Sequence, residues 1–253
     1  MANEKTFKGL IVRELAMGEQ DKLISVIAEG IGKVMISCKG VRSIRSHRLA
    51  ATQLFCYDEF TVSEKGGRMY LKEVALIDNF YPLRENIESL ALAQYICDAV
   101  CEVSLEGDSE DDEILNLALN TLYLISTGSK SKVLIKAAFE LRLCSIIGFA
   151  PLLDSCSVCG EKKDNYSLDI NGGVLICDDC WLNTENTVIS GAKLSPAILS
   201  AMRYIVSAPP KRFFSFGIDE SLYPELSDIC ERYFLSKTER SFDTLKFYRS
   251  LGI

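Results

Sequence analysis

The chain has 253 residues, of which 48% are hydrophobic and 25% charged, and its net charge is −7. A chain with this apolar fraction can bury enough surface to fold, so the composition excludes disorder of the whole chain. Its length suggests one or two domains. No apolar stretch approaches the roughly 18 residues that a membrane-spanning helix needs. The first five residues lack the basic start and apolar run of a signal peptide. We therefore expect a cytoplasmic protein that does not bind membranes.

Residues 1–80 are predicted to form a small β-barrel. Five short runs rich in Val, Ile, Leu, Phe and Tyr are separated by Gly, Asp and polar residues, as is typical of strands. Five strands in about 75 residues without a long helix fit an OB-fold, and an SH3-like barrel fits nearly as well. The expected strands are Thr6 to Arg13, Lys22 to Glu29, Lys33 to Cys38, Thr52 to Ser63 and Arg68 to Ile77.

From residue 81 onward the apolar residues recur with the period of a helix. The first helix has two apolar stripes, so it is expected to be covered on most sides. Gly148 is suited to follow a helix end, and Ser195-Pro196 to begin a helix. The expected helices are Asn86 to Ser104, Leu115 to Leu122, Leu134 to Cys144, one from Ser195 that ends before Pro209, Leu222 to Leu235 and Phe242 to Leu251.

Two CxxC pairs are separated by 17 residues, a spacing within the range of zinc sites. The residues between them predict a hairpin, Tyr166 to Ile170 and Val174 to Cys177, which would bring the two turns together. Four thiolates leave no open position on a tetrahedral ion, so we expect one structural Zn²⁺. A redox CxxC pair is the alternative, which two pairs flanking a hairpin disfavour. The predicted ligands are Cys156, Cys159, Cys177 and Cys180.

The chain is therefore predicted to belong to the α+β class. An N-terminal five-stranded OB-fold barrel, residues 1–80, would precede an all-α helical domain, residues 81–253. The helical domain would carry the inserted zinc-ribbon-like module at about residues 154–184. The six remaining cysteines have apolar neighbours and are expected to be buried thiols.

A basic segment lies in the N-terminal part, since Gly30 to Tyr57 contains no acid. Residues 1–80 carry a net charge of +2, whereas the rest of the chain carries −9. OB-folds bind single-stranded nucleic acids with cationic loops that lie beside a β-strand bearing an aromatic residue. An ordinary solvated loop is the alternative. The predicted DNA contacts are Lys33, Lys39, Arg42, Arg45, Arg48 and, alternating on one strand face, Arg68, Tyr70 and Lys72.

Motifs of catalysis are missing. The sequence has no P-loop, no G-x-G-x-x-G after a strand and no G-x-S-x-G elbow. The single histidine, His47, excludes multi-histidine metal sites. No pattern supplies a nucleophile, a base and an oxyanion donor together, so the chain is predicted not to be an enzyme.

The order of several short motifs resembles the RecO family of bacterial recombination mediators. The match runs from about residue 7 to residue 180, and the last 70 residues resemble the family only as generic helices. At Ala16-Met17 the family often has an aromatic residue such as Tyr, so this loop does not support a prediction of base stacking. The matching segments are Gly9 to Val12, Gly18 to Ile24, Gly32 to Val34, Lys39 to Arg42, Phe139 to Leu143, Gly148 to Pro151 and Cys156 to Gly160.

This resemblance implies a protein that binds single- and double-stranded DNA, anneals complementary strands and acts at the nucleoid. With RecR it would load RecA, an indirect partner, onto DNA coated by single-strand-binding protein. The acidic tail of that coating protein would need an apolar groove rimmed by cations. A zinc-ribbon scaffold that binds only protein is the alternative, which the acidic net charge favours, and a nuclease using scattered carboxylates is a third interpretation. The candidate rim cations are Arg142, Lys132, Lys136 and Arg203.

Overall fold

The structure is a computed structural model that describes residues 3–106, 112–182, 190–209 and 212–252. Contacts divide the chain into two compact units, one formed by Met1–Ser129 with Phe242–Ile253 and the other by Lys130–Ser241. The domain boundary expected at residue 80 remains a prediction, and the expected end of the module, residues 183–184, lies outside the described residues. Among the described residues, no helix is both long and apolar enough to span a membrane.

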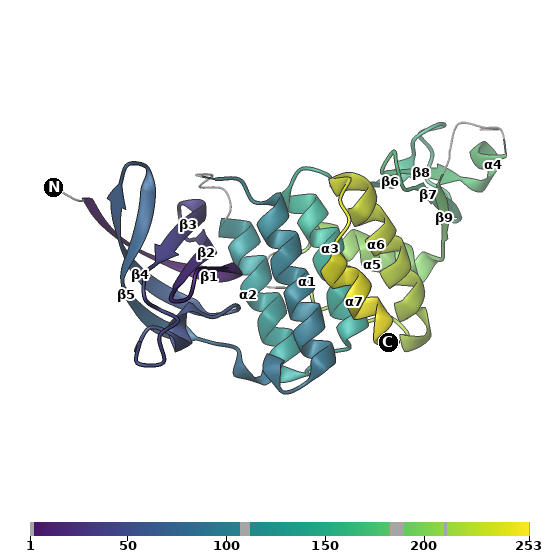
Figure 1. The fold of residues 1–253 in the computed structure, drawn as a ribbon. Helices are drawn as coiled ribbons and strands as arrows, with labels where there is room; N and C mark the ends of the chain where they lie inside the picture. Colours follow the sequence, from purple (N-terminus) through teal and green to yellow (C-terminus); the bar gives the residue numbers. More distant parts are fainter. Residues whose placement is uncertain (1–2, 107–111, 183–189, 210–211, 253) are drawn as a thin grey trace. The chain divides into compact units, whose positions relative to one another are not determined.

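Five strands of the first unit close into a barrel (Figure 1). They follow the order β1-β2-β3-β5-β4, and β4 pairs with β1. β3 and β5 are parallel and pair at Ile36–Met69 and Ser37–Tyr70, whereas the other neighbours are antiparallel. This order confirms the OB-fold and excludes the SH3-like barrel. The strands are β1 (Asn3–Met17), β2 (Asp21–Ala28), β3 (Gly32–Cys38), β4 (Tyr57–Lys65) and β5 (Arg68–Asp78).

Alternate side chains of the strands fill the barrel, as the period of two requires. Phe7, Val26, Ile36 and Phe60 are buried in one cluster. Gly9 of β1 lies so close to β2 that an added Cβ would come 2.4 Å from Val26 Cγ1. The barrel therefore needs glycine at this strand contact.

The strand expected over Thr52 to Ser63 begins later than predicted. Ala50–Thr52 forms a short 3-10 helix (η1), and β4 starts at Tyr57. Phe55 lies between them with a φ of 74°, a left-handed backbone that a strand cannot contain. Its ring is buried, and its N–H donates to the Ile11 carbonyl at 3.0 Å. Tertiary contacts thus outweigh the strand propensity of this segment.

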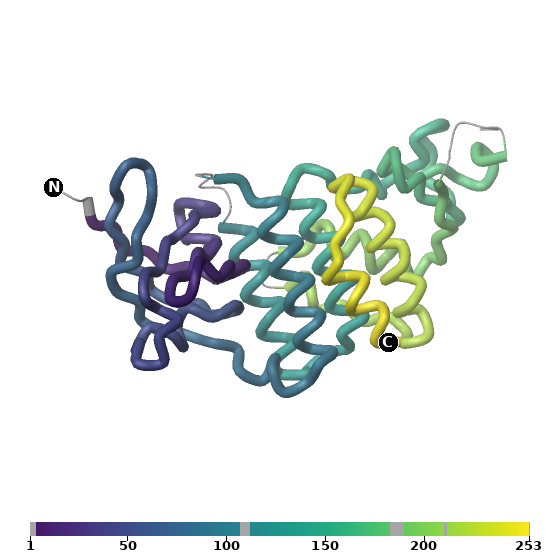
Figure 2. Tube along the Cα trace, viewed as in Figure 1, coloured from purple at the N-terminus to yellow at the C-terminus, as the bar shows by residue number. Residues whose placement is uncertain are grey.

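Helices complete the first unit, and η2 (Tyr81–Arg84) leads into the longest of them. α1 begins after Asn86, whose Oδ1 accepts from the N–H groups of Glu88 and Ser89. Most residues of both apolar stripes of α1 are buried, and Leu90 and Val103 are half-buried. α1 contacts α2, α7 and β1, and Figure 2 shows the C-terminal segment returning beside α1. The helices are α1 (Ile87–Val103), α2 (Asp112–Thr127) and α7 (Asp243–Ser250).

In the second unit α3 packs against both α5 and α6. α3 ends as predicted, with Gly148 at a φ of 87°. The N–H of Phe149 donates to the Cys144 carbonyl at 2.7 Å, the long hydrogen bond of a Schellman motif. Ser195 caps α5 by accepting from the Ile198 N–H. The elements are α3 (Lys132–Ile146), α5 (Pro196–Ser207), η4 (Glu220–Leu222) and α6 (Tyr223–Thr238).

A four-stranded sheet of order β6-β8-β7-β9 carries the cysteine motifs (Figure 1). The antiparallel pair β7–β8 is the predicted hairpin. β6 and β9 were not expected, because each has only five or four residues and pairs with a strand distant in sequence. The elements are β6 (Leu152–Cys156), β7 (Tyr166–Asp169), β8 (Val174–Cys177), α4 (Asp178–Trp181) and β9 (Gly191–Leu194).

Candidate functional site

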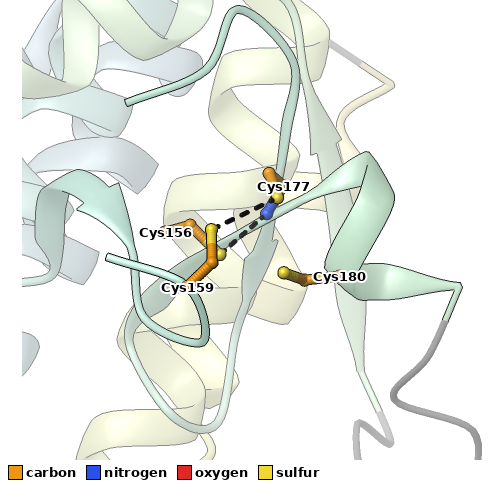
Figure 3. A group of neighbouring side chains, drawn as sticks. All are labelled: Cys156, Cys159, Cys177 and Cys180. Atoms are coloured by element: carbon orange, nitrogen blue, oxygen red, sulfur yellow. Dashed lines mark hydrogen bonds between the residues drawn. The ribbon is translucent and has the colours of Figure 1, made fainter. Parts of the chain in front are cut away.

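Four cysteines of the second unit gather at one point (Figure 3). Cys156 ends β6, and Cys159 lies in the turn after it. Cys177 ends β8, and Cys180 lies on the short helix α4. The four sulfur atoms all lie within 4.8 Å of one another. The two CxxC turns therefore face one centre, as their spacing predicts.

Backbone groups hold the Cys156 sulfur in place. The Cys177 N–H donates to Cys156 Sγ at 3.4 Å. Gly160, at a φ of 74°, closes the turn by donating to the Cys156 carbonyl at 2.9 Å. Burial disfavours the Cys156 thiolate, but the N–H groups of Cys159, Cys177 and Val158 outweigh burial and lower the pKa of Cys156 to about 6. One sulfur is thus prepared as an anion by the fold itself.

A metal ion fits this cluster. Cys159 Sγ and Cys177 Sγ are 3.9 Å apart, and sulfurs placed about 2.3 Å from a tetrahedral ion are about 3.8 Å apart. A hydrogen bond with the Cys177 sulfur and burial raise the pKa of Cys180 to about 12, and the negative charge of Cys156 adds to this effect. A divalent cation would supply the opposing charge, so the donor set matches a closed structural site.

A cavity of about 820 Å³ opens on one face of the barrel. Met17 and Asp21 flank the β1–β2 turn, and Met35 lies on β3. Gly67 lies in the β4–β5 turn, and Arg68 begins β5. In OB-folds the β2–β3 face between these two loops binds oligonucleotides. The cavity is therefore at the ligand position of the fold.

Four of the eight predicted DNA contacts line this cavity, namely Lys33, Lys39, Arg68 and Tyr70. Lys39 Nζ lies 5.6 Å from the centre of the Tyr70 ring, a cation–π contact. This pair presents a positive charge and a flat ring at one place on the face. Such a combination suits a nucleotide, which has a charged phosphate beside an aromatic base.

The four remaining predicted contacts do not line the cavity. Arg45 and Lys72 are exposed. Arg42 is exposed, and its guanidinium donates to the Gly18 carbonyl at 2.6 Å. The Arg48 guanidinium donates to the carbonyls of Lys39 and Lys72 at 3.3 and 3.4 Å. Arg48 therefore joins the basic loop to β5, and its contact with DNA remains a prediction.

Strand β5 contains a bulge at Lys72. Its pairing with β4 passes from Val62–Leu71 to Thr61–Glu73, so Lys72 has no partner residue in the register. The alternation expected for Arg68, Tyr70 and Lys72 is interrupted there. Lys72 is exposed all the same, because the bulge leaves Leu71 as the buried neighbour.

Lys33 also has a structural role. Its Nζ donates to the Cys101 carbonyl in the last turn of α1 at 2.8 Å, and its N–H donates to the Leu105 carbonyl at 3.2 Å. A cation at this position satisfies a carbonyl that the helix end leaves open. Lys33 thus uses one of its hydrogen-bond donors within the first unit.

Three methionines of the cavity lining, Met17, Met35 and Met69, were not selected from the sequence. They are three of the five methionines in the chain. Met35 lies between the buried residues Val34 and Ile36 and is 46% exposed. The period of two could have placed it on the outer face, but an apolar residue in a strand is more often part of the core.

Lys136 is not available to a partner, which corrects its selection as a rim cation. Its side chain is buried between α3 and α6. Lys136 Nζ lies 2.9 Å from Glu140 Oε1 and 2.7 Å from Glu231 Oε2. A lysine is stable in such a place because carboxylates compensate its lost hydration.

Among the other three candidate rim cations, the two arginines donate to backbone carbonyls. Arg142 Nη1 donates to the carbonyls of Ile205 and Val206 at 3.3 and 2.8 Å, at the end of α5. Arg203 Nε donates to a carbonyl of β6 at 2.7 Å, and Lys132 is half-buried at the start of α3. In the described part of the second unit, a cavity of about 380 Å³ beside α5 is lined by none of the four candidates.

The fold and the two sites define an OB-fold protein with a four-cysteine module that could hold a metal ion. Residues 1–80 match the family description "Recombination protein O N terminal", and residues 84–246 match "Recombination protein O C terminal". The chain belongs to the RecO family, which confirms the resemblance found in its motifs.

Individual relatives agree with this assignment. The DNA repair protein RecO of Acetivibrio thermocellus is 33% identical over 96% of this chain and 95% of its own length. The proteins of the same name from Clostridium acetobutylicum and Clostridium novyi are 28% and 26% identical. Each covers 96% of this chain, and the matches span 97% and 93% of those proteins.

Proposed function

We propose that this chain is a DNA repair protein that acts as a recombination mediator. It binds single- and double-stranded DNA, anneals complementary strands and, with RecR, helps to load RecA onto DNA coated by single-strand-binding protein. Membership of the RecO family along nearly the whole chain supports this function. The names of its relatives supply the role in DNA repair.

The barrel cavity is the observation that carries the DNA-binding part of the proposal. It lies on the face that OB-folds use for oligonucleotides, and it combines Arg68 with the Lys39–Tyr70 pair. Arg42 and Arg45 are exposed in the loop after β3, where a longer strand can pass. Because the chain carries a net charge of −7, we expect modest affinity with a strong dependence on salt.

Strand annealing tests the mediator role directly. Complementary oligonucleotides coated with single-strand-binding protein are mixed with this protein without ATP, and duplex formation is followed by fluorescence. We expect annealing without a nucleotide, since the sequence contains no P-loop. A requirement for ATP would contradict the proposal.

Docking of the coating protein is tested in the same assay. We propose that the second unit binds the acidic tail of single-strand-binding protein, with Arg142, Arg203 and Lys132 as the remaining candidate cations. Removal of that tail should then slow annealing. An unchanged rate would contradict the docking part and leave the annealing part intact.

We propose that the ion in the cysteine cluster is Zn²⁺, one per chain, in a structural role. A tetrahedral set of four thiolates suits zinc or an iron–sulfur cluster. Metal analysis of protein purified without added zinc tests this assignment, with a visible absorption spectrum to detect iron. A metal content near zero in well-folded protein, or the spectrum of an iron–sulfur centre, would contradict it.

A further inference from the structure

Three flexible methionines, here called the methionine floor, line the barrel cavity together with one aromatic ring, that of Tyr70. Met17 comes from β1, Met35 from β3 and Met69 from β5. Met17 and Met35 are 50% and 46% exposed, so their thioethers are accessible from solvent. β3 pairs with β5 at Ser37–Tyr70, so Met35, two residues before Ser37, shares the outer face with Tyr70. Met69 pairs with the buried Ile36 and packs against the barrel core while it also lines the cavity.

Charged groups surround this floor. Lys39, above the Tyr70 ring, and Arg68, at the β4–β5 turn, supply positive charge. Two acids also line the cavity, and one of them, Asp21, accepts from the Gly40 N–H at 2.8 Å and so holds the loop. The other, Glu106, is exposed.

We infer that the methionine floor binds unstacked bases of single-stranded DNA. This inference rests on the proposed DNA binding. A thioether is polarizable and adapts its shape, and sulfur makes favourable contacts with aromatic rings. Every base has such a ring, so the cavity accepts all four bases with little preference. Lys39 and Arg68 then contact the phosphates on either side of the bound base.

The arrangement of apolar and charged groups in the cavity favours a nucleic acid strand as the ligand. A single strand repeats a flat apolar base and a charged phosphate at every unit, which matches an apolar floor between cations. A duplex keeps its bases paired and stacked, so it reaches the cations but leaves the floor empty. The cavity therefore makes the barrel face prefer single strands over duplexes.

An oligonucleotide with abasic residues at alternate positions separates base contacts from phosphate contacts, because it keeps the number of phosphates. Binding of this strand and of the normal strand is measured by fluorescence anisotropy at one salt concentration. We expect the intact protein to bind the normal strand about five- to tenfold more tightly. The double variant Met17→Gln with Met35→Gln should lose most of this preference while it binds the abasic strand as before.

Leu15→Gln is the matched control. Leu15 lies on the same strand as Met17 and is 57% exposed, but it does not line the cavity. It should therefore keep the preference for bases. If the methionine variant keeps the full preference, the base pocket is refuted and DNA binding stands; the face is then a phosphate-binding surface or a site for a protein segment. If the intact protein binds neither strand at low salt, the proposed DNA binding is refuted as well.

Discussion

Arg13 on β1 and Asp98 on α1 form an ion pair in which Arg13 Nη2 lies 2.6 Å from Asp98 Oδ1. The other carboxylate oxygen of Asp98 accepts from Thr244 Oγ1 on α7 at 3.1 Å. A hydrogen bond to Asp98 raises the pKa of Arg13. One carboxylate thus connects the barrel, the first helix and the last helix of the first unit.

Substitution of Asp98 tests this connection. We expect Asp98→Ala to lower the free energy of unfolding by about 1–2 kcal/mol, because two hydrogen bonds are lost at a half-exposed site. Asp228→Ala, which removes an exposed pair with Arg232 on α6, should change stability by about 0.5 kcal/mol or less. Urea unfolding of both variants provides the comparison, and equal small effects would contradict a structural role for Asp98.

The buried Lys136 should be far more sensitive than a surface lysine. Lys136→Ala leaves Glu140 and Glu231 buried without the cation that they share, and we expect a loss of about 3–5 kcal/mol. Lys246→Ala, which breaks the exposed pair with Asp243, is the control and should cost about 0.5 kcal/mol or less. Thermal unfolding measures both. A fully stable Lys136→Ala variant would mean that the ion pairs do not support the α3–α6 contact.

Asp58 should make stability depend on pH. Its side chain is buried in the barrel, and within the described residues neither carboxylate oxygen has a hydrogen-bond partner. Burial raises the pKa of Asp58 to about 7, whereas an unfolded aspartate titrates near about 3.9. Between these two values the folded state keeps a proton that the unfolded state has lost. The contribution of Asp58 to stability is therefore full below about pH 4 and falls as the pH rises through about 7.

Asp58→Asn removes this titration. The free energy of unfolding of the variant minus that of the unmodified protein should rise by about 2–3 kcal/mol from pH 5 to pH 8. Other groups titrate equally in both proteins and cancel in the difference, which urea unfolding at the two pH values measures. Glu59→Gln, at the exposed neighbouring position, should show no such trend. A difference that does not change with pH would contradict a raised pKa.

Loss of one cysteine should unfold the metal module selectively. Structural zinc sites contribute on the order of 10 kcal/mol to small modules, so Cys177→Ala should release the metal and expose the amides of β6, β7 and β8 to hydrogen exchange. Cys230→Ala, a buried cysteine outside the cluster, is the control and should retain the metal. Unchanged protection of the three strands in metal-free Cys177→Ala would show that the sheet is stable by itself.

Salt dependence tests the basic face. If about five phosphates of a single strand are neutralised, the logarithm of the binding constant should fall with the logarithm of salt concentration at a slope of about −3 to −4. Arg45→Glu with Lys72→Glu should weaken binding of all sequences alike and make the slope shallower by about 1 to 1.5. Lys162 is exposed in the turn region between the two CxxC motifs. Lys162→Glu should leave the binding affinity and the salt slope unchanged. Absence of DNA binding in the unmodified protein would favour a protein-binding scaffold instead.

Local patterns in the sequence determined most of the elements and the cysteine cluster. The two CxxC motifs and the hairpin between them place four sulfurs together, because short turns depend on adjacent residues. Gly148 and Ser195 likewise mark helix ends whose hydrogen bonds are made within a few residues. The order of the family motifs could also be read directly from the chain.

Only the tertiary structure decided which side chains are available. The partner Glu140 of Lys136 lies one helical turn away, but Glu231, which completes the buried site, belongs to α6. Lys33 donates to a carbonyl of α1, and the cavity is lined by methionines from three strands. Periodicity shows which face of a helix or strand is apolar. It does not show which distant element will cover that face. Most elements thus follow from neighbours in sequence, whereas β6, β9, the cavity and the burial of charge follow from packing between segments far apart in the chain.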